Sequence, residues 1–160
     1  MRLVAPWFCV AAAALSACGS DDVVAAGDYA VTVTNRDNGC NLPSWTFGAS
    51  TAATVTLTQS QNDVTAVVTG LAAIALDLGL GGHSYTGKIH GGSLDLRLFG
   101  TRSATSGNCT YTLNSEIRAV LSGDTLDGQI DYTSATNGNP DCAGIESCDS
   151  FQELTGTRNH

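Results

Sequence analysis

The chain has 160 residues, with seven basic and fifteen acidic side chains and a net charge of −8. Such an acidic chain lacks the basic surface to which nucleic acids and anionic lipids bind. This excludes nucleic-acid binding as its function. Threonine, glycine and valine are abundant, while lysine and glutamate are scarce. This balance favours strands over helices and predicts a secreted all-β domain.

Residues 1–17 have the form of a cleaved N-terminal signal peptide. Arg2 supplies a positive charge, and the apolar run that follows is shorter than the roughly 20 residues needed to span a bilayer. The segment Leu15-Ser16-Ala17-Cys18 joins an aliphatic residue, two small residues and a cysteine. It resembles the lipobox of bacterial lipoprotein precursors. The alternative is an ordinary secretion signal in which Cys18 has no special role.

The resemblance implies that Cys18 becomes the first residue and carries palmitate-type acyl chains, which anchor the lipoprotein to a membrane. Two or three chains would hold it permanently, whereas one holds only marginally. Gly19 stands where many Gram-negative lipoproteins retained at the inner membrane have aspartate. The resemblance therefore implies the cell outer membrane as the site in the envelope, facing the periplasm or the surface.

The mature chain is expected to begin with a short tether, residues 18–27, followed by a single domain, residues 28–160. Loss of the leader removes only Arg2 among the charged groups, so the mature net charge is about −9. An even set of cysteines remains in an oxidising compartment, which predicts two disulfides. These are Cys40, Cys109, Cys142 and Cys148. Zinc is the alternative, but the spacing between Cys142 and Cys148 exceeds the usual zinc-ligand spacing.

Alternation of apolar and polar residues recurs along the mature chain and predicts about eight half-buried strands. In the first strand, for example, Tyr29, Val31 and Val33 share one face. The alternating runs cover residues 29–34, 54–58, 64–69, 84–89, 94–98, 110–121, 126–132 and 151–158.

Short and long connections alternate between these runs. The short ones are residues 59–62, 91–92 and 122–124, and the long ones are residues 35–50, 70–82, 100–108 and 134–149. An up-and-down meander places all short turns at one end, and an even strand number lets the last strand pair with the first. Closure removes exposed edges, so the pattern predicts an eight-stranded antiparallel, lipocalin-like barrel. Gly27-Asp28-Tyr29 resembles the Gly-x-Trp that opens many lipocalins, with tyrosine in place of tryptophan.

One segment leaves an alternative open. Leu71–Leu80 fits a helix, but it also fits a ninth strand, which would suggest a β-sandwich instead of a barrel. We favour a short helical or irregular lid. Within a barrel, neighbouring strands favour the disulfides Cys109–Cys142 and Cys40–Cys148. The alternative pairing is Cys40–Cys109 with Cys142–Cys148.

No catalytic, metal or cofactor site is predicted. His83 and His90 are an odd number of positions apart, so on one strand they point to opposite faces and cannot share a metal. The acidic residues of the last long loop match no calcium-loop spacing. No nucleophile is paired with a base, so we expect no enzyme.

Two hypotheses for function remain. The first is a non-enzymatic scaffold that displays disulfide-pinned loops, with Trp45 and Phe47 contacting an envelope protein. The second is a lipocalin-like carrier of a small apolar ligand, with Leu71–Leu80 as its lid. Its ligand-lining candidates are the four tyrosines, Tyr29, Tyr85, Tyr111 and Tyr132.

The lipobox has a direct test. Cells fed labelled palmitate should label the wild-type chain, and Cys18→Ala should abolish the label because the acceptor sulfur is gone. The measurement is fluorography of the immunoprecipitated protein. Label that survives in Cys18→Ala would refute the lipid attachment.

Overall fold

The computed structural model describes residues 23–160, so the signal peptide, Cys18 and the first part of the tether lie outside the described residues. None of the helices among residues 23–160 has the length and apolarity to cross a bilayer. The elements in chain order are β1 (Gly27–Asn38), β2 (Ser50–Ser60), β3 (Asp63–Thr69), α1 (Leu71–Gly79), β4 (Ser84–His90), β5 (Ser93–Leu98), β6 (Ser103–Ser106), β7 (Cys109–Ser122), β8 (Thr125–Thr136), the 3-10 helix η1 (Pro140–Cys142) and β9 (Asp149–Arg158).

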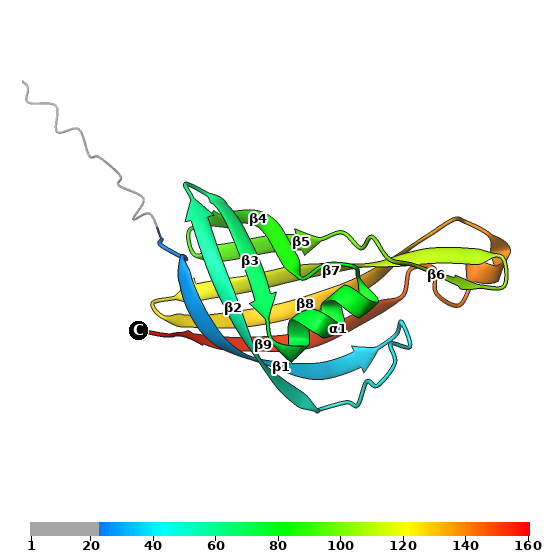
Figure 1. The fold of residues 1–160 in the computed structure, drawn as a ribbon, viewed down its shortest axis with the longest axis horizontal. Helices are drawn as coiled ribbons and strands as arrows, with labels where there is room; N and C mark the ends of the chain where they lie inside the picture. Colours follow the sequence, from blue (N-terminus) through cyan, green and yellow to red (C-terminus); the bar gives the residue numbers. More distant parts are fainter. Residues whose placement is uncertain (1–22) are drawn as a thin grey trace, which may run out of the picture.

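The strands form one closed antiparallel sheet (Figure 1). Strands that are consecutive in the sequence pair with each other, except β5 and β6. In addition β9 pairs with β1, and β5 pairs with β7 from Ser93↔Val120 to Leu98↔Ser115. The predicted eight-stranded antiparallel barrel is therefore confirmed. The β-sandwich alternative is wrong, because the β5–β7 pairing leaves no second sheet.

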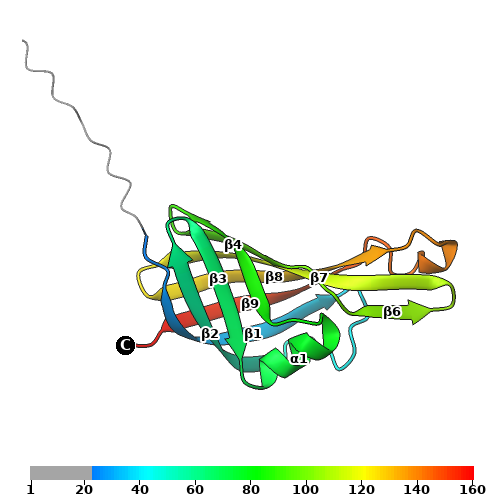
Figure 2. The ribbon, with the colours of Figure 1, turned by 45° about the horizontal axis from the view of Figure 1, so that its top comes forward.

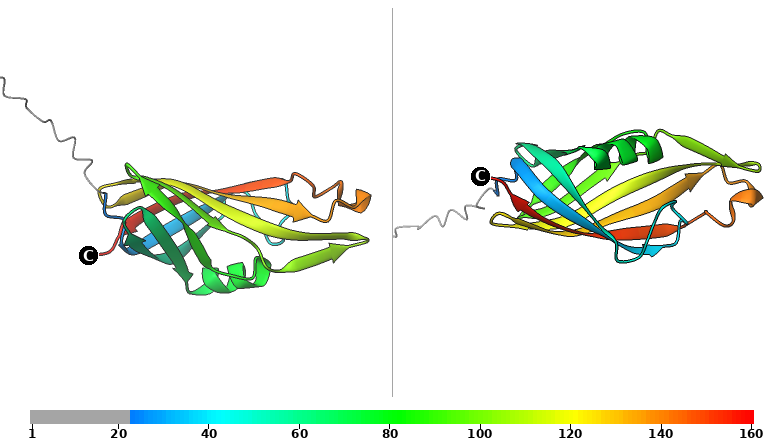
Figure 3. Two further views of the ribbon diagram at one scale, coloured as in Figure 1. Left: turned by 90° about the horizontal axis from the view of Figure 1, so that it is seen from above. Right: turned by 60° about the horizontal axis from the view of Figure 1, so that its bottom comes forward.

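A ninth strand, β6, lies in the segment 100–108 that we expected to be only a connection. It pairs with the outer part of β7, from Ser103↔Thr112 to Ser106↔Cys109, beyond the barrel wall. Together with the β8–β9 connection it forms an arm at one end of the molecule (Figure 3). Its sequence, Ser-Ala-Thr-Ser, is short, polar and fully exposed, so it carries no alternation to recognise.

Short and long connections separate to opposite ends, as the alternation predicted (Figure 1). The β4–β5 turn is Gly91-Gly92, and both residues adopt the left-handed backbone that glycine tolerates, with φ of 55° and 86°. Residues 71–79 are helical and lie against β2 and β3, so they are not a ninth barrel strand (Figure 2).

The tight-turn half of the barrel is filled by side chains. Its buried residues include Tyr29, Leu57, Val64, Ala66, Ile89, Leu94, Leu96, Ala119, Leu121 and Leu126. The chain segment before β1 caps this end. Tyr29 Oη donates to the Ala25 carbonyl at 2.9 Å, and Arg158 Nε donates to Tyr29 Oη at 3.0 Å. Gln59 Nε2 donates to the Val23 carbonyl at 3.1 Å.

Two disulfides fasten the long-loop end. Cys40–Cys148 joins the β1–β2 loop to the β8–β9 connection, and Cys109–Cys142 joins the start of β7 to η1. These are the pairs that neighbouring strands favour in an eight-stranded barrel, and not the alternative pairing.

At Gly87 the backbones of the adjacent strands β4 and β5 approach each other closely. A Cβ atom at this inward position of β4 would lie 1.9 Å from the Asp95 carbonyl oxygen on β5. A side chain there would push the two strands apart, because backbone atoms cannot rotate away.

We therefore expect Gly87→Ala to lower the free energy of unfolding by about 3 kcal/mol, the upper part of the range for overpacking. The measurement is urea unfolding followed by circular dichroism. Gly82→Ala is the matched control, since nothing lies within 4 Å of the Cβ built there. Equal stability of the two variants would contradict the proposed close approach.

Candidate functional site

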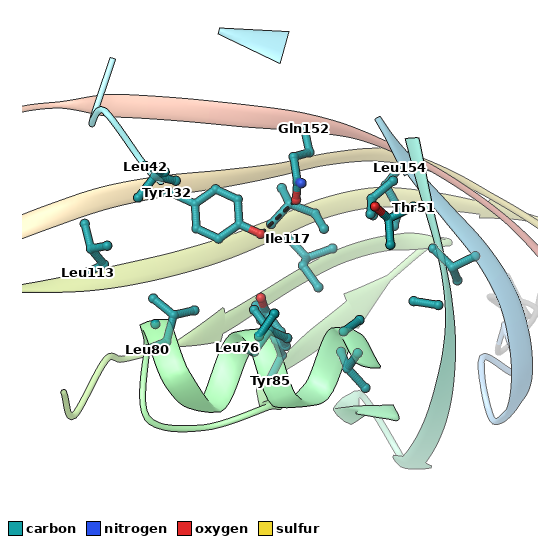
Figure 4. A pocket seen from close by; sticks show the side chains of 18 of the residues that line it. Leu42, Thr51, Leu76, Leu80, Tyr85, Leu113, Ile117, Tyr132, Gln152 and Leu154 are labelled. Carbon is teal, nitrogen blue, oxygen red and sulfur yellow. Dashed lines mark hydrogen bonds between the residues drawn. The ribbon is translucent and has the colours of Figure 1, made fainter. Parts of the chain in front are cut away.

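A cavity of about 310 Å³ occupies the long-loop half of the barrel (Figure 4). Residues from β1, β2, β3, β4, β7, β8, β9, α1 and the β1–β2 loop surround it. The lining residues are Val31, Val33, Leu42, Pro43, Trp45, Thr51, Ala53, Val55, Val68, Ala72, Ala75, Leu76, Gly79, Leu80, Tyr85, Leu113, Ile117, Ile130, Tyr132, Gln152 and Leu154. Four of these are also exposed and mark the opening between α1 and the β1–β2 loop: Pro43, Thr51, Ala75 and Gly79.

Small inward side chains leave this half hollow while the other half is full. Val33 of β1 and Ala53 of β2 lie near each other on two paired strands. Both side chains are small and only partly buried, and larger residues at these positions would fill the barrel. The helix α1 then covers the space from the side instead of a strand. Its inner face brings Ala72, Leu76 and Gly79 to the cavity.

The helix is held at both ends. It starts after Gly70, whose φ of 75° turns the chain away from β3. At its other end the Leu80 carbonyl accepts hydrogen bonds from the backbone N–H groups of Thr101 at 2.8 Å and Arg102 at 3.2 Å. The Leu80 side chain is buried, which anchors the end of the helix in the apolar core.

The β1–β2 loop forms the opposite rim. The Asn38 side chain clamps Leu42, accepting from its N–H at 2.7 Å and donating to its carbonyl at 3.0 Å. Trp45 Nε1 donates to the Arg36 carbonyl at 2.8 Å, and the indole meets the Tyr132 ring edge-on at 6.0 Å between centroids. These bonds turn the indole toward the cavity.

The two aromatic residues predicted to contact a partner therefore differ. Trp45 is half-buried and lines the cavity, because its indole nitrogen is bonded to the chain behind it. Phe47 is 68% exposed, with the Arg36 guanidinium 5.8 Å from its ring centroid.

A line of polar groups crosses the apolar interior. Tyr85 Oη donates to Ser115 Oγ at 3.1 Å. Ser115 lies opposite Tyr132 in the β7–β8 pair. Tyr132 Oη donates to Gln152 Oε1 at 2.8 Å (Figure 4), and Gln152 Nε2 donates to Asn35 Oδ1 at 2.7 Å.

The cavity carries no formal charge. Its lining contains no lysine, arginine, histidine, aspartate or glutamate. Burial raises the pKa of Tyr85 to about 12, although the hydrogen bond with Ser115 partly opposes the shift. Burial also raises the pKa of Tyr132 well above its usual value, and the neighbouring Tyr85 adds to the effect. Both phenols are therefore neutral hydrogen-bonding groups at physiological pH.

The four tyrosines proposed as ligand-lining residues separate into two pairs. Tyr85 and Tyr132 line the cavity. Tyr29 does not, because its hydroxyl is bonded to Ala25 and Arg158 at the tight-turn end. Tyr111 does not either, because it lies opposite Ala104 of β6 on the arm.

Ser115 and Gln152 are site residues that sequence reasoning missed. Ser115 occupies an inward position between Leu113 and Ile117, so alternation alone could have identified it as a buried hydroxyl. Gln152 precedes Leu154 by two positions and shares its face. His83 instead pairs with Asp77 of α1 at 2.8 Å, and residues 23–160 hold no cluster of potential metal ligands.

Comparisons with known proteins give no relative: no protein-family model matches the chain, and neither a curated protein nor a solved structure shows significant similarity to it.

The buried phenols predict a loss of stability in alkali. In the unfolded chain a tyrosine ionises near pH 10, so between pH 10 and 12 the folded protein keeps a proton on Tyr85 that the unfolded chain loses. Proton loss then favours the unfolded state, and the free energy of unfolding falls as the pH rises through this window.

At pH 11 we expect the wild type to have lost about 1.4 kcal/mol more than Tyr85→Phe, each relative to its own stability at pH 9. Urea unfolding at the two pH values measures the difference. Parallel losses in both proteins would show that the folded Tyr85 ionises like an unfolded one.

Proposed function

We propose that this protein binds a small, predominantly apolar molecule inside its barrel. The single observation that supports the proposal is the hollow half of the barrel, since a barrel needed only as a rigid stand gains stability from filling its interior. The volume of about 310 Å³ lies at the lower end of the range for small-molecule pockets.

Binding, and not catalysis, is the proposed activity. The lining offers phenols, a threonine hydroxyl and an amide, but no group that exchanges a proton near neutral pH. The affinity would come mainly from removing apolar ligand surface from water, about 25 cal/mol for each Å².

The helix α1 serves as the movable side of the opening in this proposal. Its outer face leaves Leu71 and Leu78 84% and 65% exposed, so few contacts hold it from outside. Elements with few buried contacts are the ones that open at low cost. The opposite rim is fixed by Cys40–Cys148, which limits the motion to the α1 side.

In the cell, we further propose that acyl chains on Cys18 hold the protein at the envelope membrane, most consistently the outer membrane. Residues 23–27 reach β1 at the tight-turn end. The anchor would then hold that end near the bilayer and leave the opening of the cavity on the far side.

A scaffold function is the second candidate. Phe47 is exposed on a loop that Cys40–Cys148 pins, which suits contact with an envelope protein. Trp45 supports the scaffold function less well than an exposed tryptophan would, because its side chain faces the cavity.

Filling the cavity tests the binding proposal. Ala53 lines the cavity, while the adjacent Ala52 is exposed on the outer face of the same strand. The purified protein should bind the neutral fluorophore N-phenyl-1-naphthylamine with an increase in emission. Ala53→Phe should weaken this binding at least about tenfold because the ring occupies the ligand volume.

Ala52→Phe is the matched control and should bind like the wild type. Circular dichroism checks that both variants keep the barrel. Unchanged fluorophore binding by a folded Ala53→Phe, or no binding by the wild type, would contradict a ligand site in the cavity.

A further inference from the structure

Gly79 is one of the exposed residues that mark the opening of the cavity. It lies in the last turn of α1, seven positions after Ala72 and three after Leu76, both of which also line the cavity. Residues at this spacing share one face of a helix. Figure 4 shows the Leu76 side chain on the side of α1 that faces the cavity. A side chain at position 79 would therefore point into the opening.

The fold itself does not require a glycine at position 79. Its backbone is right-handed helical, and the glycine that ends the helix is Gly81, with a φ of 85°. The Gly81 N–H donates to the carbonyls of Leu76 at 3.2 Å and Asp77 at 3.1 Å. No atom of residues 23–160 lies within 4 Å of a Cβ placed on Gly79, so close packing does not exclude a side chain either. Gly79 thus weakens α1 relative to alanine without a structural need.

The end of α1 that carries Gly79 is fixed to the barrel. The neighbouring Leu80 is buried, and its carbonyl accepts the backbone N–H groups of Thr101 and Arg102. In addition, His83 Nδ1 lies 2.8 Å from Asp77 Oδ1. Because these contacts hold the helix end in place, a side chain at position 79 would stay in the opening. This part of the opening therefore depends on the absence of a side chain.

We propose that Gly79 determines access to the cavity: the ligand enters and leaves past position 79, and the missing side chain sets the rate of its exchange. The inference rests on the proposed function and adds the route by which the site is filled. Position 79 lies at the exposed rim, whereas buried residues such as Val55 and Tyr85 enclose the interior. A side chain at the rim thus obstructs the passage more than it changes the bound state.

The test is stopped-flow fluorescence of the purified protein with N-phenyl-1-naphthylamine, which gives the association and dissociation rate constants. Gly79→Leu should lower both constants at least about tenfold, because the ligand crosses the same obstruction in both directions. The Kd should then change by less than about threefold, since it is the ratio of the two constants. Gly79→Ala adds a smaller group and should slow both steps about two- to threefold.

Gly82→Leu is the matched control. Gly82 does not line the cavity, its φ lies outside the left-handed region, and no atom of the described chain lies within 4 Å of a Cβ placed there. This variant should exchange the fluorophore at the wild-type rates. Urea unfolding provides a readout of a purely structural role. Gly79→Ala should be at least as stable as the wild type because alanine favours a helix, whereas a structural need for glycine would make it less stable.

The outcomes separate the inference from the proposed function. Absence of fluorophore binding by the wild type would overturn both. Wild-type rates in a folded Gly79→Leu would overturn the passage and leave the binding cavity in place. Weaker binding with an unchanged association rate would also overturn it, because position 79 would then belong to the bound site. If Gly79→Leu does not fold, Gly79→Ala decides, and wild-type rates in that variant overturn the inference.

Discussion

The pairing of β5 with β7 is the constraint on which the rest of the molecule depends. It joins Ser93–Leu98 to Ser115–Val120 and passes over β6, which is left on the outer part of β7. The pairing completes the ring of eight strands and gives every inward position a common interior. It also places Ser115 beside the interior hydroxyls of β4 and β8, since the pair ends at Leu98↔Ser115. Without this closure the polar line would face solvent.

Closure alone does not decide what the interior contains. The tight-turn half is filled by leucine, isoleucine and tyrosine side chains and capped by the segment before β1. The other half has smaller side chains and the helix α1 in place of a wall of large residues. The packed half of the barrel therefore contributes most of the buried apolar contacts, and the other half contains the cavity. The two disulfides lie at the cavity end, where side-chain packing contributes least to stability.

Much of the fold follows from local patterns in the sequence. Alternation with period two identifies strands such as β5, whose Leu94, Leu96 and Leu98 are all buried, and the alternation of loop lengths implies closure. The polar β6 has no such pattern. The inward orientation of Trp45 has no sequence pattern either. It depends on a hydrogen bond to the Arg36 carbonyl, which forms only after the loop has folded back. The cavity depends on the sum of side-chain volumes across several strands, which no single segment contains.

The cap at the tight-turn end also defines how the molecule would carry mechanical load. A pull applied to the chain at Val23 meets Gln59 of β2 and then Arg158 of β9, whose guanidinium donates to the Val24 carbonyl at 2.6 Å. These two strands flank β1 on either side. Tension would therefore spread across three paired strands in the packed half before reaching the hollow one. The side chains that fill the packed half would therefore take up the strain before it reached the cavity residues of the same strands.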